Sequence, residues 1–418
     1  MDKYFSDKVE EGIRLVWCTF QPEEMQKGLQ LLEEAANEGD ADAMCFLARA
    51  YMGKEYVWGD GGLPFDRALA YSWVNKSVMK GSAAGVLSAL RLRQLTSSIC
   101  KEMPCSLKAA RDIILERAEA GHAFCQFMIG DVYYWGDLIV IDRINVKKKY
   151  PTNRDYDAFA DPIAVGWYER ALKNGLTLPA RNLQVIFEDG VSPLGKNDEK
   201  LFYYTKLAAE LGDPEMMNNY GVMLSDADRE EEGLLWCKKS ADAGESVGCY
   251  NIGDQYEYGW TVEEDQVKAF EYYMKAAQKE NPSAYYKIGY YYYYGKVVKQ
   301  DKAQAVYWLK KGEEEDEYWP CPLLGVCYQN GWGGLEVDYD YAYDLLCLAD
   351  SYSDEFDDET LGVLWNGLGN AFYFGWGINT NYVIALQFYQ EAVEVGNAEA
   401  KKNIKKFHID SSGKWRLA

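Results

Sequence analysis

Small and aromatic residues recur at helical spacing along most of the chain. Two clear copies occupy residues 268–277 and 304–311. Apolar residues three and four positions apart share one face of an α-helix, so each copy predicts an amphipathic helix. Further copies occupy residues 68–79, 110–120, 164–172, 201–209, 234–243, 342–349 and 385–393. The pattern therefore predicts an all-α chain.

A second pattern joins these helices. A helix ends in Ala-x-x-Gly, a small residue follows nine positions later, and an aromatic residue follows three positions after that, as in Gly121, Gly130 and Tyr133. We expect the first glycine to end its helix in the left-handed conformation. We expect the second, here called the crossing glycine, to let two helices approach with no β-carbon between them.

The helix-ending position recurs with a period near 36 residues, interrupted by insertions. It falls at Gly39, Gly81, Gly121, Gly175, Gly212, Gly244, Glu280, Asp316, Thr360 and Gly396. A further glycine closes the first helix of a pair at Gly136, Gly190, Gly259, Gly295, Gly331 and Gly375. Such a repeat predicts a continuous stack of about ten helix pairs over residues 1–408, followed by a C-terminal tail at 409–418.

Insertions interrupt the stack at a few places. The largest is a loop insertion at residues 137–162, in which the apolar run 139–146 suggests an extended hairpin and Lys147–Lys149 a solvated loop tip. The glycine clusters at 59–62 and 331–334 lie between helices and lack the Lys-Ser/Thr of a phosphate-binding loop. We therefore predict that both clusters are turns.

The combined string Ala-x-x-x-x-Leu-Gly-x-x-Tyr-x-x-Gly, followed by Asp and Ala-x-x-Trp/Phe-Tyr-x-x-Ala-Ala-x-x-Gly, resembles the Sel-one-like repeat, a relative of the tetratricopeptide repeat. The resemblance extends from about residue 5 to about residue 408. It implies an α/α right-handed superhelical solenoid of helix-turn-helix repeats that binds another protein.

The resemblance also implies a binding surface. In the tetratricopeptide architecture the first helix of each pair lines a concave groove, with its inward positions flanking the crossing glycine. Transferred to this chain, the groove residues are Phe127, Asp131, Tyr134, Tyr250, Asp254, Glu257, Tyr258, Tyr286, Tyr290, Tyr293, Tyr294, Asn330, Asn366, Asn370 and Tyr373. Aromatic, amide and acidic side chains suit a protein or peptide ligand. The alternative is that many of these rings pack between helices, but the five consecutive rings of Tyr290–Tyr294 cannot all point into one core.

The charge balance narrows the choice of partner. The chain has 44 basic and 66 acidic residues, a net charge of −22, which repels nucleic acid and anionic lipid. Acidity favours a basic partner, although it also serves solubility alone. Neither a membrane-spanning apolar run nor a secretory signal is evident, and the ten cysteines lack regular pairing. We expect a cytoplasmic protein with free thiols.

The sequence offers little for catalysis. With two histidines, His122 and His408, histidine-based triads and multi-histidine metal sites are nearly excluded. We predict no catalytic residue, no cofactor and no metal site, and hence no enzyme.

Three hypotheses of function remain. The first is a non-enzymatic scaffold or adaptor that holds a protein or peptide in its aromatic and acidic groove. The second is an immunity or inhibitor protein that neutralises a basic toxin. The third is a binding protein or enzyme for a small ligand such as a sugar or peptidoglycan fragment. Self-association through exposed aromatic residues would be a further use of the same surface.

Overall fold

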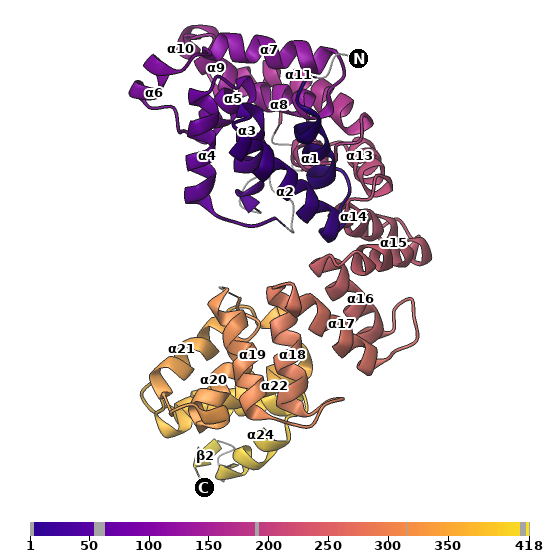
Figure 1. The fold of residues 1–418 in the computed structure, drawn as a ribbon. Coiled ribbons are helices and arrows are strands. Elements are labelled where there is room, and N and C mark those ends of the chain that lie inside the picture. Colours follow the sequence, from indigo (N-terminus) through magenta and orange to yellow (C-terminus); the bar gives the residue numbers. More distant parts are fainter. Residues whose placement is uncertain (1–3, 54–62, 189–191, 316, 410–414, 418) are drawn as a thin grey trace. The chain divides into compact units, whose positions relative to one another are not determined.

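The computed structural model describes residues 4–53, 63–188, 192–315, 317–409 and 415–417. The predicted turn at 59–62 and the predicted helix-ending residues Gly190 and Asp316 lie outside the described residues. The chain divides into two compact units, Met1–Ala243 and Gly244–Ala418 (Figure 1). The division falls at Gly244, one of the predicted junctions between helix pairs.

Unit 1 is a succession of helices. They are α1 (Asp7–Trp17), α2 (Pro22–Glu38), α3 (Ala41–Ala50), α4 (Arg67–Met79), α5 (Ala83–Arg91), α6 (Ser97–Glu102), α7 (Leu107–Glu119), α8 (Ala123–Tyr134), α9 (Asp137–Ile141), α10 (Val146–Lys149), α11 (Asn153–Lys173), α12 (Pro179–Glu188), α13 (Asp198–Glu210), α14 (Pro214–Ser225) and α15 (Glu230–Asp242). A continuous apolar cluster runs from Phe5 to Leu224 within this unit.

Unit 2 continues the alternation and ends in a small hairpin. Its elements are α16 (Ser246–Tyr258), α17 (Gln266–Gln278), α18 (Pro282–Tyr294), α19 (Lys302–Glu314), α20 (Cys321–Asn330), η2 (Trp332–Gly334), α21 (Tyr339–Asp350), η3 (Ser353–Glu355), α22 (Asp358–Phe374), α23 (Tyr382–Glu394), α24 (Ala398–Asn403), η4 (Ile404–Lys406), β1 (Phe407–Ile409) and β2 (Trp415–Leu417). The two antiparallel strands pair Phe407 with Leu417, and β2 lies in the predicted C-terminal tail.

Helices pack in pairs within each unit, so the predicted α/α solenoid is confirmed. In unit 2 the pairs are α16 with α17, α18 with α19 and α20 with α21 (Figure 1), followed by α22 with α23. In unit 2 the second helices begin at an Asp or Asn whose side chain accepts a hydrogen bond from the first backbone N–H groups, as at Asp265, Asp301 and Asn381. This N-cap satisfies donors that a helix start leaves free.

Most predicted helix ends are confirmed. The backbone is left-handed at the helix-ending Gly39, Gly81, Gly121, Gly175, Gly212, Gly244, Glu280 and Gly396, and at the first-helix ends Gly136, Gly259, Gly295, Gly331 and Gly375. Thr360 is different: it lies inside the first turn of α22, where Asp357 caps its backbone N–H at 2.7 Å. The prediction of a helix end at Thr360 is therefore wrong.

The close approach at the crossing glycines is also confirmed. A β-carbon added to Gly253 would lie 2.5 Å from the ring of Tyr273, and one added to Gly369 would lie 2.6 Å from the ring of Tyr389. Atoms that close overlap, so the second helix could not keep its position.

The insertion at 137–162 is helical, so the expectation of an extended hairpin is wrong. The start of its apolar run, residues 139–141, lies in α9, from which Leu138 and Ile141 are buried. Thr152 and Asp155 form a reciprocal cap that starts α11, and this helix continues through Pro162 into the second helix of the pair. The helical period of Leu138 and Ile141, three residues apart, explains why this run packs as a helix.

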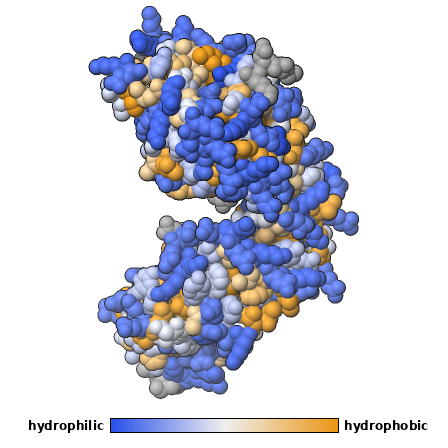
Figure 2. Space-filling model, in the orientation of Figure 1, coloured by the Kyte–Doolittle hydropathy of each residue, from blue (hydrophilic) through white to orange (hydrophobic). Residues whose placement is uncertain are grey.

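Hydrophilic residues cover most of the face of each unit that Figure 2 shows. Hydrophobic residues appear on it in separate patches. The cysteines are free thiols, and most of them are buried.

Candidate interaction site

The predicted groove residues divide between the two units. Phe127, Asp131 and Tyr134 belong to α8 in unit 1, and the others belong to unit 2. Phe127 is fully buried, and the ring of Tyr134 packs at 6.1 Å from that of Tyr168. Asp131 accepts a hydrogen bond from Tyr168 at 2.8 Å. These three side chains therefore pack inside unit 1 rather than forming an open groove there.

Four residues near the C-terminus are engaged in a comparable way. Asn366 accepts a hydrogen bond from the side chain of Asn403 at 2.9 Å, and Asn370 accepts one from the hydroxyl of Tyr389 at 2.8 Å. Tyr373 packs against Phe407 with ring centroids 5.8 Å apart. The amide of Asn330 donates to a carbonyl of its own helix, and Asn330 remains exposed. The first three thus hold the segment that closes unit 2.

Six predicted residues come together at one pocket of unit 2. The pocket has a volume of about 330 Å³. Its lining is Tyr250, Asp254, Glu257 and Tyr258 of α16, Ser283, Tyr286, Lys287 and Tyr290 of α18, Trp319 before α20, and Glu355, Phe356 and Asp357 before α22. Carboxylates and aromatic rings thus line the same hollow.

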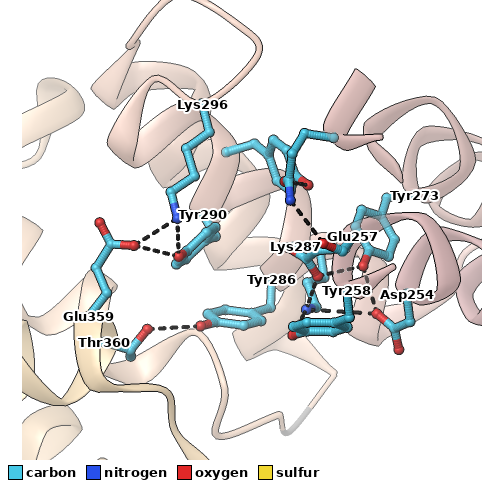
Figure 3. Close-up of polar contacts among 12 residues, drawn as sticks. Asp254, Glu257, Tyr258, Tyr273, Tyr286, Lys287, Tyr290, Lys296, Glu359 and Thr360 are labelled. Atoms are coloured by element: carbon cyan, nitrogen blue, oxygen red, sulfur yellow. Dashed lines mark hydrogen bonds and ion pairs between the residues drawn. The ribbon is translucent and has the colours of Figure 1, made fainter. Parts of the chain in front are cut away.

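Unequal helix lengths create this pocket. Each of these helices begins at a different distance before its own crossing glycine. The distance is seven residues for α18, four residues for α20 and eleven residues for α22. Because α20 starts late and α22 starts early, the first turn of α22 reaches α18, two pairs back along the chain. The hydroxyls of Tyr286 and Thr360 are 3.2 Å apart, and the hydroxyl of Tyr290 donates to Glu359 at 2.6 Å (Figure 3).

A largely buried lysine of α18 connects this helix to the α16 side of the pocket. The ammonium of Lys287 contacts the Glu257 carboxylate, donates to the Tyr258 hydroxyl at 2.8 Å and lies 3.7 Å from Asp254 Oδ1 (Figure 3). The Tyr273 hydroxyl lies 2.6 Å from Asp254 Oδ1 and 2.7 Å from Glu257 Oε2. The side chain of Lys287 is 11% exposed, so water screens these contacts weakly.

The electrostatics follow from burial and from these neighbours. Burial alone would lower the pKa of Lys287, but the charges of Glu257 and Asp254 outweigh it and raise that pKa well above its usual range. Burial raises the pKa of Asp254, against the opposing effects of Lys287 and the Tyr273 hydroxyl. Lys287 therefore stays charged at neutral pH, and Asp254 takes up a proton more readily than an ordinary aspartate.

A second, more open ion pair fixes the start of α22. Lys296 lies 2.7 Å from Glu359 and donates to the Tyr290 hydroxyl at 2.5 Å (Figure 3). Burial, followed by the hydrogen bond to Glu359, raises the pKa of Tyr290. The phenol is therefore a hydrogen-bond donor throughout the neutral range.

Aromatic rings form the remaining walls. Trp319 packs at 5.8 Å from Tyr286 and at 5.2 Å from Phe356, which is buried. On the rim, Tyr258 is 51% exposed and stacks on Trp260, which is 65% exposed. The pocket thus opens beside an exposed aromatic pair.

The tyrosine run 290–294 is less exposed than we expected. Tyr290, Tyr291 and Tyr293 are buried, and Tyr292 and Tyr294 are half-buried. Tyr291 and Tyr292 pack against Phe270 of α17, whereas Tyr293 packs against Trp332. The five rings therefore pack against neighbouring elements on several sides of α18, and not into a single core.

Sequence reasoning missed Ser283, Lys287, Glu355, Phe356 and Asp357. Lys287 lies two residues before the crossing glycine, outside the positions that the tetratricopeptide geometry assigns to the groove. The segment 354–359 is rich in acidic residues. Its place over α18 depends on the lengths of three helices, which no local signal gives.

The described residues show no group of three or more His, Cys, Asp or Glu side chains arranged to hold a metal ion. Among the helices of the described residues, none has the length and apolar character needed to cross a membrane.

A family model described as "Sel1 repeat" matches residues 21–40, 41–82, 161–176, 185–213, 214–245, 246–281, 282–316, 323–349 and 366–397. No curated protein matches the chain.

Several solved structures are similar to this chain. One is a protective antigen of uropathogenic Escherichia coli strains, with 20% identity and a TM-score of 0.48 over 95% of this chain and 86% of that chain. A Sel1 repeat protein from Oxalobacter formigenes has 19% identity and a TM-score of 0.45 over 97% and 96%. An immunity protein from Pseudomonas aeruginosa has 17% identity and a TM-score of 0.29 over 50% and 75%.

Proposed function

The chain belongs to the Sel1 repeat family, and on that premise we propose that it is a non-enzymatic scaffold or adaptor whose partner is a protein or peptide. Stacked helix pairs of this kind typically present an extended surface for protein–protein interaction. We place the binding surface on the pocket face of unit 2, where α16, α18 and the start of α22 meet.

The observation that carries the proposal is the pocket with its aromatic rim. Tyr258 and Trp260 expose large rings beside a hollow lined by carboxylates. Exposed aromatic side chains next to a concave, partly polar site are typical of the residues that dominate binding energy in protein interfaces. Tyr258 is also fixed by Lys287, so little side-chain freedom would be lost on binding.

Acidity favours one specific form of this function, an immunity or inhibitor protein for a basic toxin. A net charge of −22 would speed encounter with a basic protein at low salt. This form predicts that charge reversal at Asp254 and Glu257 abolishes binding.

The size of the pocket supports a second candidate, a small-ligand binding protein. Its volume of about 330 Å³ lies at the lower end of the range found for small-molecule sites. A sugar or peptidoglycan fragment that fits would raise the melting temperature. If a broad panel of such compounds gives no shift, this candidate loses its support.

We also propose that the protein works in a reducing compartment, the cytoplasm. The free cysteines support this placement, because an oxidising compartment favours disulfides. Fractionation of cells with an antibody to the native protein tests it.

The test of the main proposal compares two tyrosines of equal exposure. Tyr258 on the pocket rim and Tyr307 on α19 are both 51% exposed, and Tyr307 does not line the pocket. We expect wild-type protein and the Tyr307→Ala variant to retain the same protein partner in affinity capture, and Tyr258→Ala to lose it. Binding is then repeated with the purified partner.

Two results would count against the proposal. One is the absence of a reproducible partner across growth conditions. The other is equal binding by the Tyr258→Ala and Tyr307→Ala variants, which would place the partner elsewhere. Light scattering on the free protein identifies self-association, in which the captured partner is a second copy of this chain.

A further inference from the structure

The charge in the unit 2 pocket is unbalanced. Four carboxylates line it, from Asp254, Glu257, Glu355 and Asp357, together with a single ammonium group, that of Lys287. The pocket therefore carries a net charge of about −3 when all are ionised, which disfavours anionic ligands and favours a cation.

The resident ammonium leaves part of this charge uncompensated. Lys287 contacts Glu257 on the α16 wall and lies 3.7 Å from Asp254 Oδ1. Glu355 and Asp357 lie on the opposite wall and are exposed. Asp357 uses Oδ1 to cap α22. A cation that binds the carboxylates of both walls needs hydrogen-bond donors that point in more than one direction.

Aromatic rings make up much of the remaining lining. Tyr250, Tyr258, Tyr286, Trp319 and Phe356 contribute rings to the lining. Faces of aromatic rings attract cations, and a planar guanidinium also stacks on them. A guanidinium is more weakly hydrated than an ammonium and carries five donors in a fixed plane, so it combines both requirements of this pocket.

On the basis of the proposed function, we infer that the pocket receives an arginine side chain of the protein partner, stacked on the rings of Tyr258, Tyr286 and Trp319 and paired with Asp254 and the Glu355–Asp357 wall. A cavity of about 330 Å³ accommodates one long side chain, with its methylene stem against the rings. The exposed Tyr258–Trp260 pair would then contact the residues of the partner that flank the arginine.

The test uses three acetylated and amidated tripeptides, Gly-Arg-Gly, Gly-citrulline-Gly and Gly-Lys-Gly. Citrulline has the shape of arginine without its charge. Dissociation constants are measured on the full-length protein by ligand-observed saturation-transfer NMR. We expect the arginine peptide to bind at least about tenfold more tightly than the citrulline peptide, and the lysine peptide to fall between them.

Two variants with the same change of net charge locate the site. Glu355→Gln with Asp357→Asn removes the charge of the α22 wall, and the asparagine keeps the N-cap of α22. Glu336→Gln with Asp344→Asn removes two exposed acids that do not line the pocket. We expect the pocket variant to raise the dissociation constant of the arginine peptide by about fivefold or more. The control variant should change that constant by less than about twofold. Equal melting temperatures of the two variants establish that both are folded.

Equal binding of the arginine and citrulline peptides, equal weakening by both variant pairs, or no saturable binding of the arginine peptide would each overturn the inference. The proposed function fails separately. If a protein partner is captured while the arginine peptide does not bind, the scaffold function is supported and the arginine site is contradicted. If the arginine peptide binds while no protein partner is found, the guanidinium site is supported and the scaffold function is contradicted.

Discussion

Tyr168, Tyr273 and Tyr389 connect paired helices by the same two contacts. Each ring fills the space beneath a crossing glycine, and each hydroxyl donates to the residue after that glycine, which is Asp131, Asp254 or Asn370. In the pairs where Leu309 and Leu346 take the place of the tyrosine, the residue after the glycine is Tyr290 or Val326. The acceptor is thus present where the hydroxyl needs one, because a buried hydroxyl without a partner is costly.

The first prediction concerns Gly253. In Gly253→Ala the new β-carbon would meet the fully buried ring of Tyr273, so we expect the free energy of unfolding to fall by about 1–3 kcal/mol. Gly166 of α11 is the matched control, because nothing lies within 4 Å of an added β-carbon there. Gly166→Ala should raise stability by about 0.5–1 kcal/mol, since alanine favours a helix interior. Urea unfolding followed by circular dichroism measures both. A neutral Gly253→Ala variant would contradict the close-packing argument.

The second prediction concerns Asp131, which is 4% exposed. Burial raises its pKa to about 7, although Arg49 and the Tyr168 hydroxyl oppose the shift. The pKa of Asp131 is higher in the folded chain than in the unfolded chain. The contribution of this group to the free energy of unfolding therefore falls as pH rises from about 4 to about 7. Asp131→Asn removes that loss. Its stability relative to wild type should therefore increase by up to about 1.4 kcal/mol per pH unit across this range and then level off.

Urea midpoints of wild type and Asp131→Asn, measured from pH 4 to pH 8, give this difference directly. The other buried acids are common to both proteins and cancel. A difference that stays constant with pH would mean that Asp131 titrates normally in the folded chain.

At the scale of helices, length decides where the pocket forms. Asp357 starts α22 early, and the late start of α20 leaves α18 uncovered at that level. The repeat pattern predicted the helix ends at glycines because a left-handed conformation is a local requirement. It failed at Thr360 because the segment between α21 and α22 departs from the repeat. Contacts such as that between Tyr286 and Thr360 could not be predicted, since they join residues two helix pairs apart.

Two lysines that join helices should differ greatly in their contribution to stability. Lys287 links α18 to α16 with its side chain 11% exposed, whereas Lys296 links the end of α18 to α22 with 39% exposed. Lys287→Met leaves Glu257 and Asp254 without their countercharge in a buried place, and we expect a loss of roughly 3 kcal/mol at pH 7. Lys296→Met should cost at most about 1 kcal/mol, because water already screens that pair.

The pH dependence of the Lys287→Met variant provides a check. Burial already raises the pKa of Asp254, and without the opposing ammonium this carboxylate takes up a proton more readily, so the loss should shrink as pH falls towards 4. Thermal melts at pH 7 and pH 4.5 compare the two variants. Equal losses for Lys287→Met and Lys296→Met would show that burial of the α16–α18 pair does not determine its contribution.

At the scale of the whole chain, the pocket belongs to one unit. Its lining residues, from Tyr250 to Asp357, fall within Gly244–Ala418, and the apolar cluster of unit 1 ends before that boundary. In a repeat protein, stability is approximately a sum over repeats and the interfaces between neighbouring repeats. A cut at a junction between pairs therefore removes one interface, whereas a cut inside a pair also removes a helix from its partner.

The fragment 244–418, which begins at such a junction, should fold by itself. We expect helical circular dichroism and a cooperative melt, because the helix pairs of unit 2 are all retained. If the pocket holds a guanidinium, this fragment should bind the arginine tripeptide within about twofold of the full chain, since every lining residue is retained. The fragment 266–418 is the control: it lacks α16 and so leaves α17 without its partner and the pocket without Asp254. A fragment 244–418 that is unfolded, or that is no more stable than 266–418, would show that unit 2 depends on the rest of the chain.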